Sequence, residues 1–486
     1  MKLYSTSVFD RAKTRKRGTM NSSKPTVLIQ GGTLIDPSQN LHTKASLLCE
    51  GASVSQIIHE SDGPALAQAR SSADRILDAA GRIVCPGFVD IHMHEDPCDL
   101  PTDVLDRSIA RSMVQMGVTS ALGGNCGTNK CHPSDYLDLL DRHGTATNVG
   151  LLAGHTFLRN LCGGTDKYGP VSDGTLQRMV DQAKRALDAG CFGVSFGVKY
   201  IPGTEWKEIV GLAGLCRETG RLVSSHVRND VSRVFAACEE LARIGREAGV
   251  KVQFSHIGSM GGYGQMPRLL EQIEGYRREG IDMMADCYPY DAFSTDIGAT
   301  TYDEGFLEEY QSDYSHIQLA DGKYAGQRCT KEIFDELRAE APDTLTIGYF
   351  MREEDVDLAL RSPFVMVGSD GLRNGLLGHP RAAGTFPRVL SRYVKRGVLD
   401  LDTAIAKMTW IPAQRIGLSR KGRLAPGCDA DVVIFDADRI IDRATFTSPA
   451  LPPEGIDYVL LGGQVAVDHG HLVREDLGRS LRFGQS

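Results

Sequence analysis

The feature that most constrains how this chain can fold is an alternation of short apolar strands and helical stretches between residue 83 and about residue 415. Eight segments have the length and residue types of buried strands, and helical patterns such as 175–189, 231–248 and 266–280 lie between most of them. The strand segments are 83–91, 119–123, 150–154, 192–196, 222–225, 251–255, 282–286 and 364–368. Eight strands with crossover helices predict an α/β fold, a parallel (β/α)8 barrel of the TIM type. An open doubly wound sheet is the alternative.

The two ends of the chain have a different pattern, of short alternating strands joined by turns that contain Gly and Pro. We therefore expect residues 25–82 and 416–486 to form one small β-sandwich domain, with a barrel of residues 83–415 inserted between them. Within the barrel, residues 291–363 are much longer than an ordinary loop, which predicts a lid over the barrel mouth. Residues 1–24 are basic and polar, which predicts a disordered tail.

The composition is that of a soluble globular protein, with 41% hydrophobic and 24% charged residues. A formal net charge of −8 argues against nucleic acid or an anionic membrane as the main partner. No apolar run reaches the roughly 18 residues of a membrane span. The 12 cysteines are scattered without the spacing of a disulfide framework or a Cys-x-x-Cys zinc site. We therefore expect a cytoplasmic protein in a reducing compartment.

Metal-capable or polar side chains stand just past the ends of most of the predicted strands. His92 and His94 follow the first strand, and they point the same way because side chains alternate along a strand. The other members of the set are Cys126, His155, Lys199, Tyr200, His226, His256 and Asp370. The active sites of parallel barrels lie at the C-terminal ends of the strands and combine residues from several of them. The pattern therefore predicts one shared site, with ligands that suit zinc or a similar divalent ion.

An ordered set of motifs makes the chain resemble the amidohydrolase superfamily and, within it, the D-aminoacylase (N-acyl-D-amino-acid deacylase) family. The resemblance extends from about residue 26 to residue 483. The motifs are Pro86-Gly-Phe-Val-Asp-Ile-His-Met-His94, Gly117-Val-Thr119, Gly124-Asn-Cys-Gly127, Gly154-His155 with Arg159, Gly193-Val-Ser-Phe-Gly-Val-Lys-Tyr-Ile-Pro-Gly203, Ala285-Asp-Cys-Tyr-Pro-Tyr290, Gly368-Ser-Asp-Gly371, Gly378-His-Pro-Arg381 with Gly384-Thr-Phe-Pro-Arg388, and Asp429-Ala-Asp-Val-Val-Ile-Phe-Asp436.

The resemblance implies a metal-dependent hydrolase of amide bonds. We expect His92 and His94 to bind a first metal and His226 and His256 a second. Asp370 is the expected ligand and general base, which takes a proton from the attacking water and gives it to the leaving nitrogen. Many members of the superfamily join two metals through a carboxylated lysine, where this chain has Lys199, whereas D-aminoacylases use a cysteine, where it has Cys126. We expect both among the ligands, and the number of metals, one or two, stays open.

The expected substrate is a small N-acyl amino acid, whose carboxylate an arginine would hold through a planar two-pronged contact. Arg381 is the first choice, with Arg228 and Arg159 as further candidates. Tyr200, Tyr288 and Tyr290 could add hydroxyl donors, and His155 could bind substrate or be structural. The chain departs from the family at Gly258, where deacylases often have a lysine after the sixth strand.

Two other functions are considered. Lys199 would favour a cyclic-amide hydrolase of the hydantoinase or dihydroorotase kind. An inactive barrel that acts as a scaffold would have lost ligands, whereas every expected ligand type is present. Analogy alone leaves a homo-oligomer open.

Overall fold

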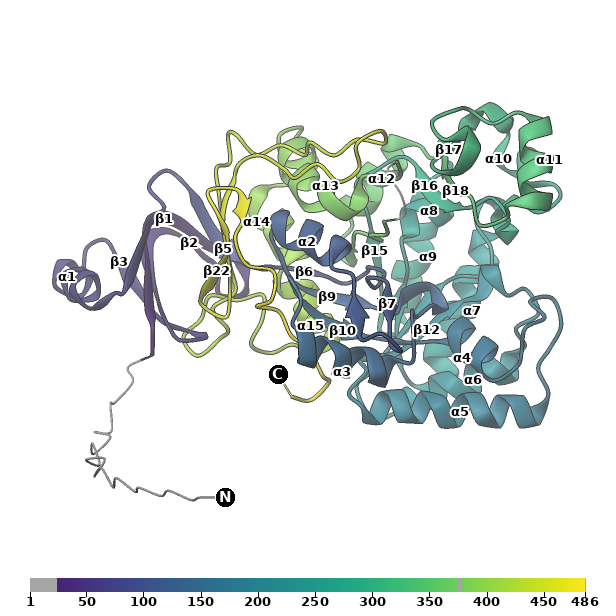
Figure 1. Ribbon diagram of the computed structural model, residues 1–486, viewed down its shortest axis with the longest axis horizontal. Coiled ribbons are helices and arrows are strands. Elements are labelled where there is room, and N and C mark those ends of the chain that lie inside the picture. The colour runs from purple at the N-terminus through teal and green to yellow at the C-terminus, as the bar shows by residue number, and fades with distance from the viewer. Residues whose placement is uncertain (1–23, 374–376, 486) are drawn as a thin grey trace, which may run out of the picture.

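The computed structural model describes residues 24–373 and 377–485, so residues 1–23 of the predicted tail lie outside the described residues. All eight predicted strands are present, and their bounds lie within two residues of the expected ones. They pair in parallel (Figure 1). Their order along the chain is β6 (Phe88–Asp90), β9 (Val118–Gly123), β10 (Asn148–Leu151) with β11 (Ala153–Gly154), β12 (Gly193–Gly197), β13 (Leu222–His226), β14 (Lys251–Phe254), β15 (Met283–Cys287) and β19 (Val365–Val367). This arrangement confirms an α/β fold.

Hydrogen bonding groups these strands into two parallel sheets, β10-β9-β6 and β11-β12-β13-β14-β15-β19. Leu152 alone separates β10 from β11, so the third strand passes from one sheet to the other. At the other junction, Met93 forms a parallel bridge with Gly371, just beyond β6 and β19. Strands that are adjacent in the chain are therefore adjacent in space, and their C-terminal ends share one side of the molecule.

The helices that lie between the parallel strands and after the last of them cover the strands from outside (Figure 1). They are α2 (Ser108–Gln115), α3 (Pro133–His143), α4 (His155–Leu161), α5 (Asp173–Asp188), α6 (Trp206–Ala213), α7 (Val234–Ala248), α8 (Ile257–Gly261), α9 (Met266–Arg278), α12 (Glu353–Arg361), α13 (Arg381–Arg388), α14 (Leu401–Met408) and α15 (Trp410–Ile416). The predicted helices 175–189, 231–248 and 266–280 correspond to α5, α7 and α9. Each buries one apolar face, as in α7, where Val234, Cys238 and Leu241 are buried.

The first predicted strand, 83–91, is divided at Gly87. Its first part, β5 (Ile83–Pro86), pairs with strands from both chain ends, and its second part, β6, pairs with β9. A Cβ atom on Gly87 would lie 2.2 Å from Oγ1 of Thr119, so only glycine allows the two strands to approach this closely. The chain thus passes from one sheet to the next at a point where no side chain fits.

Both chain ends contribute to a nine-stranded sheet in the order β23-β22-β21-β20-β5-β1-β2-β3, with β4 beside β1. The bounds are β1 (Thr26–Asp36), β2 (Leu41–Glu50), β3 (Ser53–His59), β4 (Arg75–Asp78), β20 (Val432–Phe435), β21 (Ile456–Leu461), β22 (Gln464–Asp468) and β23 (His471–Leu472). Helix α1 (Gly63–Ser72) packs beside it. Residues 416–486 were expected to belong to the small β domain as a whole. Residues 478–483 instead leave this sheet and pack against the parallel strands. Ser480 bridges to Val149, and the Phe483 ring packs on Phe192, 5.9 Å between centroids.

The predicted insertion 291–363 contains a small antiparallel sheet of β16 (Phe293–Asp296), β18 (Leu345–Gly348) and β17 (Ile317–Leu319). It also carries two helices, α10 (Phe306–Tyr310) and α11 (Lys331–Glu340). It projects from the parallel strands at the upper right of Figure 1. Its last part differs from the prediction, because α12 buries Val356 and Leu360 and belongs with the outer helices.

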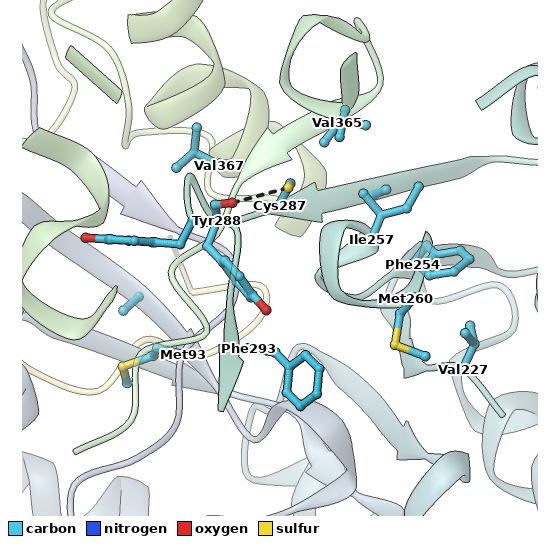
Figure 2. Close-up of a cluster of buried hydrophobic side chains, with 14 of the residues drawn as sticks. Met93, Val227, Phe254, Ile257, Met260, Cys287, Tyr288, Phe293, Val365 and Val367 are labelled. Carbon is cyan, nitrogen blue, oxygen red and sulfur yellow. Dashed lines mark hydrogen bonds between the residues drawn. The ribbon is translucent and has the colours of Figure 1, made fainter. Parts of the chain in front are cut away.

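Buried apolar side chains surround the C-terminal ends of the parallel strands. Figure 2 shows Phe254, Val365 and Val367 from the strands beside Met260 and Phe293 from the segments that follow. This packed layer fixes the strand ends, and with them the polar side chains that follow. Among the described residues, no helix is long and apolar enough to cross a membrane.

Candidate metal centre

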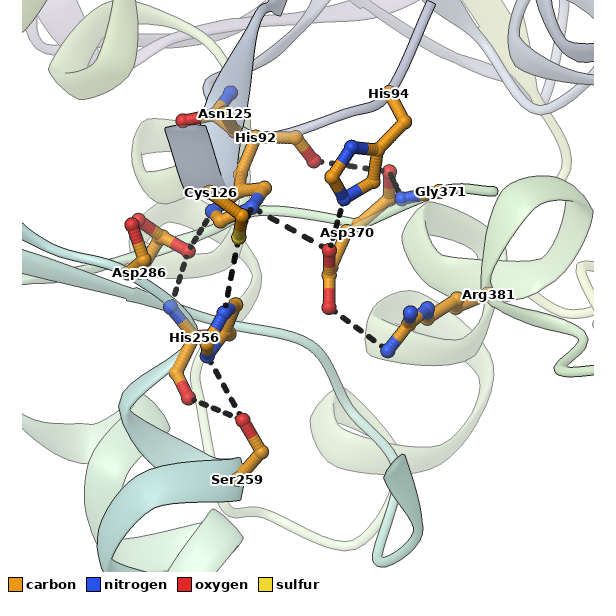
Figure 3. A network of polar contacts seen from close by, with 12 residues as sticks. His92, His94, Asn125, Cys126, His256, Ser259, Asp286, Asp370, Gly371 and Arg381 are labelled. Carbon is orange, nitrogen blue, oxygen red and sulfur yellow. Dashed lines mark hydrogen bonds and ion pairs between the residues drawn. The ribbon is translucent and has the colours of Figure 1, made fainter. Parts of the chain in front are cut away.

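Six potential ligands from separate parts of the sequence form two overlapping groups of side chains, most of which Figure 3 shows. The first group is His92, His94, Cys126 and Asp370, and the second is Cys126, His226 and His256. In each group the potential ligand atoms all lie within 4.8 Å of one another. Cys126 belongs to both groups, so its sulfur is the atom that the two have in common.

The distances within the groups are those of a compact polar centre. The Cys126 sulfur lies 3.4 Å from Nε2 of His92 and 3.3 Å from Nε2 of His256. An Asp370 carboxylate oxygen lies 3.0 Å from Nε2 of His94 and 3.4 Å from Nε2 of His92. Thiolate, imidazole and carboxylate are together the ligand types of zinc sites.

Hydrogen bonds orient two of the imidazoles so that Nε2 faces the thiolate. Nδ1 of His92 donates to the Asp286 carboxylate at 2.9 Å, which also accepts from the backbone N–H of His256 at 2.8 Å. The Ser259 hydroxyl donates to the His256 carbonyl and therefore accepts from Nδ1 of that ring at 2.8 Å. In both rings Nε2 is thereby directed at the thiolate, and it is the atom through which the ring would bind a metal.

Asp286 and Ser259 were not predicted as site residues. Asp286 is the last residue of the predicted seventh strand, 282–286, and it lies in one of the family motifs. Those two signals together could have identified it. Ser259 lies on α8, which begins directly after His256. Only this helical turn brings the serine hydroxyl back to the His256 ring, so the sequence alone did not indicate the contact.

Three of the potential ligands have a left-handed backbone, which residues with a side chain seldom adopt. The φ angles are +53° at Cys126, +34° at His256 and +49° at Asp370. Such a conformation costs on the order of 1–3 kcal/mol per residue and persists only where the surroundings hold it. At Asp370 the backbone N–H donates to the His92 carbonyl at 2.7 Å. The strain turns each side chain out of its strand and towards the centre.

The electrostatics of the site favour an ionised thiol and an ionised carboxyl group. Burial alone would raise the pKa of Cys126, but His256 and His92 hold the pKa well below its ordinary value. Burial would likewise raise the pKa of Asp370, but Arg381 and hydrogen bonds from His92 and His94 lower it well below the usual range. Both groups are therefore in the charged form that a metal ligand needs.

His226 gives an independent test of whether a metal fits. The residue is 6% exposed, both ring nitrogens are buried, and neither has a hydrogen-bond partner among the described residues. Burial, followed by the charge of His256, lowers the pKa of His226, so the ring is neutral. A buried polar group without a partner costs about 1–3 kcal/mol. A cation between His226 and Cys126 would satisfy it, so the residues fit a bound metal.

Arg381 connects the centre to the cavity beside it. Its guanidinium lies 2.8 Å from Asp370 and over the Tyr288 ring, 5.1 Å from the centroid. Its Nε atom is buried and has no hydrogen-bond partner among the described residues. Arg381, Asp370 and Tyr200 line both an inner pocket and an outer cavity of about 550 Å³, and Tyr288 lines the inner pocket. The inner pocket also includes Phe293, Thr301 and Tyr310 from the insertion.

Lys199 does not join the two ligand groups. Its ammonium pairs with Asp230 at 2.6 Å, and the Tyr310 hydroxyl donates to the other oxygen of that carboxylate at 2.7 Å. An ammonium paired in this way has no lone pair for a metal. The predicted role of Lys199 as a ligand therefore has no support from the geometry, and the shared position belongs to Cys126.

Three further predicted substrate contacts are occupied by internal partners. His155 and Arg159 are fully buried and both contact Glu208, at 3.1 Å and 2.7 Å. Arg228 pairs with Glu240 at 2.8 Å. None of these three side chains lines the inner pocket or the outer cavity. Tyr290 packs against the His379 ring, 4.9 Å between centroids, and is also not a lining residue.

The cluster around Glu208 makes a prediction about stability. Glu208→Ala leaves the buried Arg159 charge unpaired and is expected to lower the free energy of unfolding by about 3–5 kcal/mol. The matched control is Asp335→Ala, which removes an exposed ion pair with Lys331 and should cost about 1 kcal/mol or less. Urea denaturation of both variants measures the difference, and equal midpoints would contradict the structural role of Glu208.

Comparison with known proteins agrees with the geometry of the centre. Residues 321–467 match the amidohydrolase family. The chain is 33% identical to an N-acyl-D-glutamate deacylase of Alcaligenes xylosoxydans xylosoxydans, over 93% of this chain and 96% of that protein. A solved N-acyl-D-glutamate deacylase of Bordetella bronchiseptica, complexed with zinc and a phosphonate inhibitor, is 30% identical with a TM-score of 0.82, over 95% of this chain and 100% of that one.

A solved D-aminoacylase described with a binuclear metal center is 28% identical to this chain, with a TM-score of 0.83 over 94% of this chain and 99% of that one. The likeness thus covers the parallel strands, the nine-stranded sheet and the insertion alike. Sequence, fold and ligand set lead to the same result: this chain belongs to the D-aminoacylase family of amidohydrolases.

Proposed function

We propose that the protein is a zinc-dependent deacylase that hydrolyses the amide bond of N-acyl-D-amino acids. The observation that carries this proposal is the position of Asp370, between the ligand group of His92 and His94 and the guanidinium of Arg381. One carboxylate therefore faces both the site of the reacting water and a cation suited to a substrate carboxylate. The relatives described above act on N-acyl-D-amino acids, which supports the same substrate class.

We assign the ligands by group. His92 and His94 would hold one zinc ion, His226 and His256 a second, and Cys126 would contact both. A bound zinc ion would supply Lewis acidity for the amide carbonyl and would lower the pKa of a water to about 7. Asp286 and Ser259 fix the rings of His92 and His256 for this purpose.

The protein's own groups account for the remaining steps. Asp370 accepts a proton from the attacking water as the water oxygen bonds to the acyl carbon, and it returns this proton to the amide nitrogen as the C–N bond breaks. Arg381 binds the carboxylate of the amino acid, for which its Nε is the free donor. Tyr200 and Tyr288, on the walls of the inner pocket, limit the space for the substrate. The products are a carboxylic acid and a D-amino acid.

We also infer that the eight parallel strands close into a (β/α)8 barrel. The bridge between Met93 and Gly371, and the hydrogen bond from the His94 N–H to the Gly371 carbonyl, support closure between the first and last strands. In this arrangement the nine-stranded sheet is a separate small domain, and the insertion is a lid over the barrel mouth. The 12 free cysteines support a cytoplasmic location.

The two alternatives now have less support. The cyclic-amide hydrolase depended on Lys199 as a metal bridge, and that side chain pairs with Asp230 instead. The inactive scaffold predicted a loss of ligands, whereas all the expected histidines and Cys126 lie together.

The test of the proposal is amine release from paired N-acetyl-D- and N-acetyl-L-amino acids by zinc-reconstituted protein. Hydantoin and dihydroorotate are assayed alongside, and the amino acids include glutamate and an apolar residue. We expect turnover of D substrates only. Ring opening of hydantoin or dihydroorotate without deacylation would favour the cyclic-amide reading. If the zinc-bound protein hydrolyses none of these compounds, the proposed substrate class is contradicted.

A further inference from the structure

We propose that Cys98 and Cys131 are a redox-active pair of thiols that forms an intramolecular disulfide. Their sulfur atoms lie 3.6 Å apart. Cys98 begins the short strand β7 (Cys98–Asp99), in the loop that follows His94, and Cys131 lies in the loop that follows Cys126. The pair thus connects two loops that carry potential metal ligands. Formation of the disulfide does not depend on the proposed function.

The pair is distinct among the cysteines of the chain. All 12 lie within the described residues and all are free thiols, but only Cys98 and Cys131 have sulfur atoms in contact. A disulfide has sulfur atoms about 2.05 Å apart, so the thiols must approach by roughly 1.5 Å. Both side chains are half-buried on loops, and β7 pairs only with the two-residue strand β8 (Val104–Leu105). A small shift of this hairpin would bring the sulfur atoms together.

Both thiols are partly exposed, so an oxidant can reach them from outside. Cys131 lines an open cavity of about 670 Å³, away from the metal centre, together with Phe157, Cys162 and Arg178. The hydrogen bond between the two thiols lowers the pKa of Cys98, which increases the thiolate fraction. Cys126, in contrast, is 4% exposed. The pair is therefore the more accessible target for a peroxide.

The chemistry balances with hydrogen peroxide as the two-electron oxidant. The Cys98 thiolate attacks one peroxide oxygen, the O–O bond breaks, and a sulfenic acid forms as hydroxide leaves and takes up a proton. Cys131 then loses its proton and its thiolate attacks this sulfur; the S–O bond breaks, the disulfide forms, and the leaving hydroxide takes up the proton as a second water. Two thiols are oxidised and one peroxide is reduced to two waters.

The disulfide would tie the two ligand-bearing loops together. They already touch, because the Asn129 side chain donates to Glu95 at 2.6 Å. A covalent link beside this contact limits how far the segment with His94 can separate from the segment with Cys126. The oxidised protein should therefore release zinc to a chelator several-fold more slowly than the reduced protein.

The test is titration of the full-length zinc protein with hydrogen peroxide, followed by alkylation of free thiols and peptide mass spectrometry. We expect an intact-mass loss of about 2 Da and one peptide pair joined through Cys98 and Cys131, both reversed by dithiothreitol. Cys131→Ser and Cys98→Ser should abolish the linked peptides. Cys162→Ser is the matched control, since Cys162 lines the same cavity without a sulfur neighbour, and it should keep them.

Two results would overturn the inference. Oxidation of Cys126 or Cys162 before any linked peptide forms would show that the pair is not the preferred target. Equal rates of zinc release from the oxidised and reduced forms would show that the link does not restrain the centre. Peptide mapping of the unmutated protein decides the first point even if a serine variant folds poorly.

Discussion

Replacing Asp370 with asparagine is expected to lower kcat for amide hydrolysis by about 10²–10⁴-fold, the usual contribution of a general acid–base group. The asparagine amide has nearly the same size, but it cannot accept the proton of the attacking water. Asparagine is also among the residues that best tolerate the left-handed backbone found at this position, φ +49°. The variant therefore removes the negative charge of the side chain and keeps its size and the backbone conformation.

The Asp370→Asn experiment needs two further measurements, because Asp370 is also a potential ligand. Zinc content by metal analysis separates proton transfer from ligation. Unchanged zinc with a large loss of kcat assigns the proton transfer, and loss of one zinc ion assigns the ligand role. Asp296→Asn is the matched control, because Asp296 is an exposed carboxylate on the outer cavity, and it should retain kcat within about tenfold. Full activity in Asp370→Asn would refute the assignment.

The second large effect is expected at Cys126. Cys126→Ser keeps the backbone and the size of the side chain but exchanges a thiolate for a neutral hydroxyl, which is a poor zinc ligand at neutral pH. Loss of an outer-shell partner alone costs about 10–100-fold in metal affinity, so loss of a ligand shared by two groups should cost at least as much. Zinc content and deacylase activity should fall together.

Cobalt substitution provides a direct readout for Cys126. The unmutated protein should show a thiolate-to-cobalt charge-transfer band that Cys126→Ser lacks. Cys162→Ser is the control, because this half-buried thiol lies outside both ligand groups and should leave the band and the zinc content unchanged. A band that persists in Cys126→Ser would mean that another group binds the metal.

Most of the architecture was predictable because it depends on local patterns. The eight strand segments are short apolar runs separated by helices, and such runs bury themselves whatever the details of the loops. The division at Gly87 was not predictable. It depends on the close approach of Thr119, a residue that is remote in sequence.

The same distinction holds for the candidate site. His92, His94, Cys126, His226, His256 and Asp370 were predicted because each follows a strand, and strands that run parallel end on the same side. His155 and Lys199 also follow strands, yet they have other partners. His155 contacts Glu208 from α6, and Lys199 forms an ion pair with Asp230. Position at a strand end brings a side chain to the right side of the molecule, but neighbouring charges decide where it points.

The sequence by itself thus determined the α/β fold, the family and the set of residues that could bind metal. The tertiary structure decided which of two possible bridging residues lies between the ligand groups, that Asp286 orients His92, and that Cys98 faces Cys131. The physical reason is the range of the interactions. Strand and helix patterns repeat over a few residues and are visible in the chain, whereas ion pairs and hydrogen bonds join side chains that only the folded backbone brings within reach.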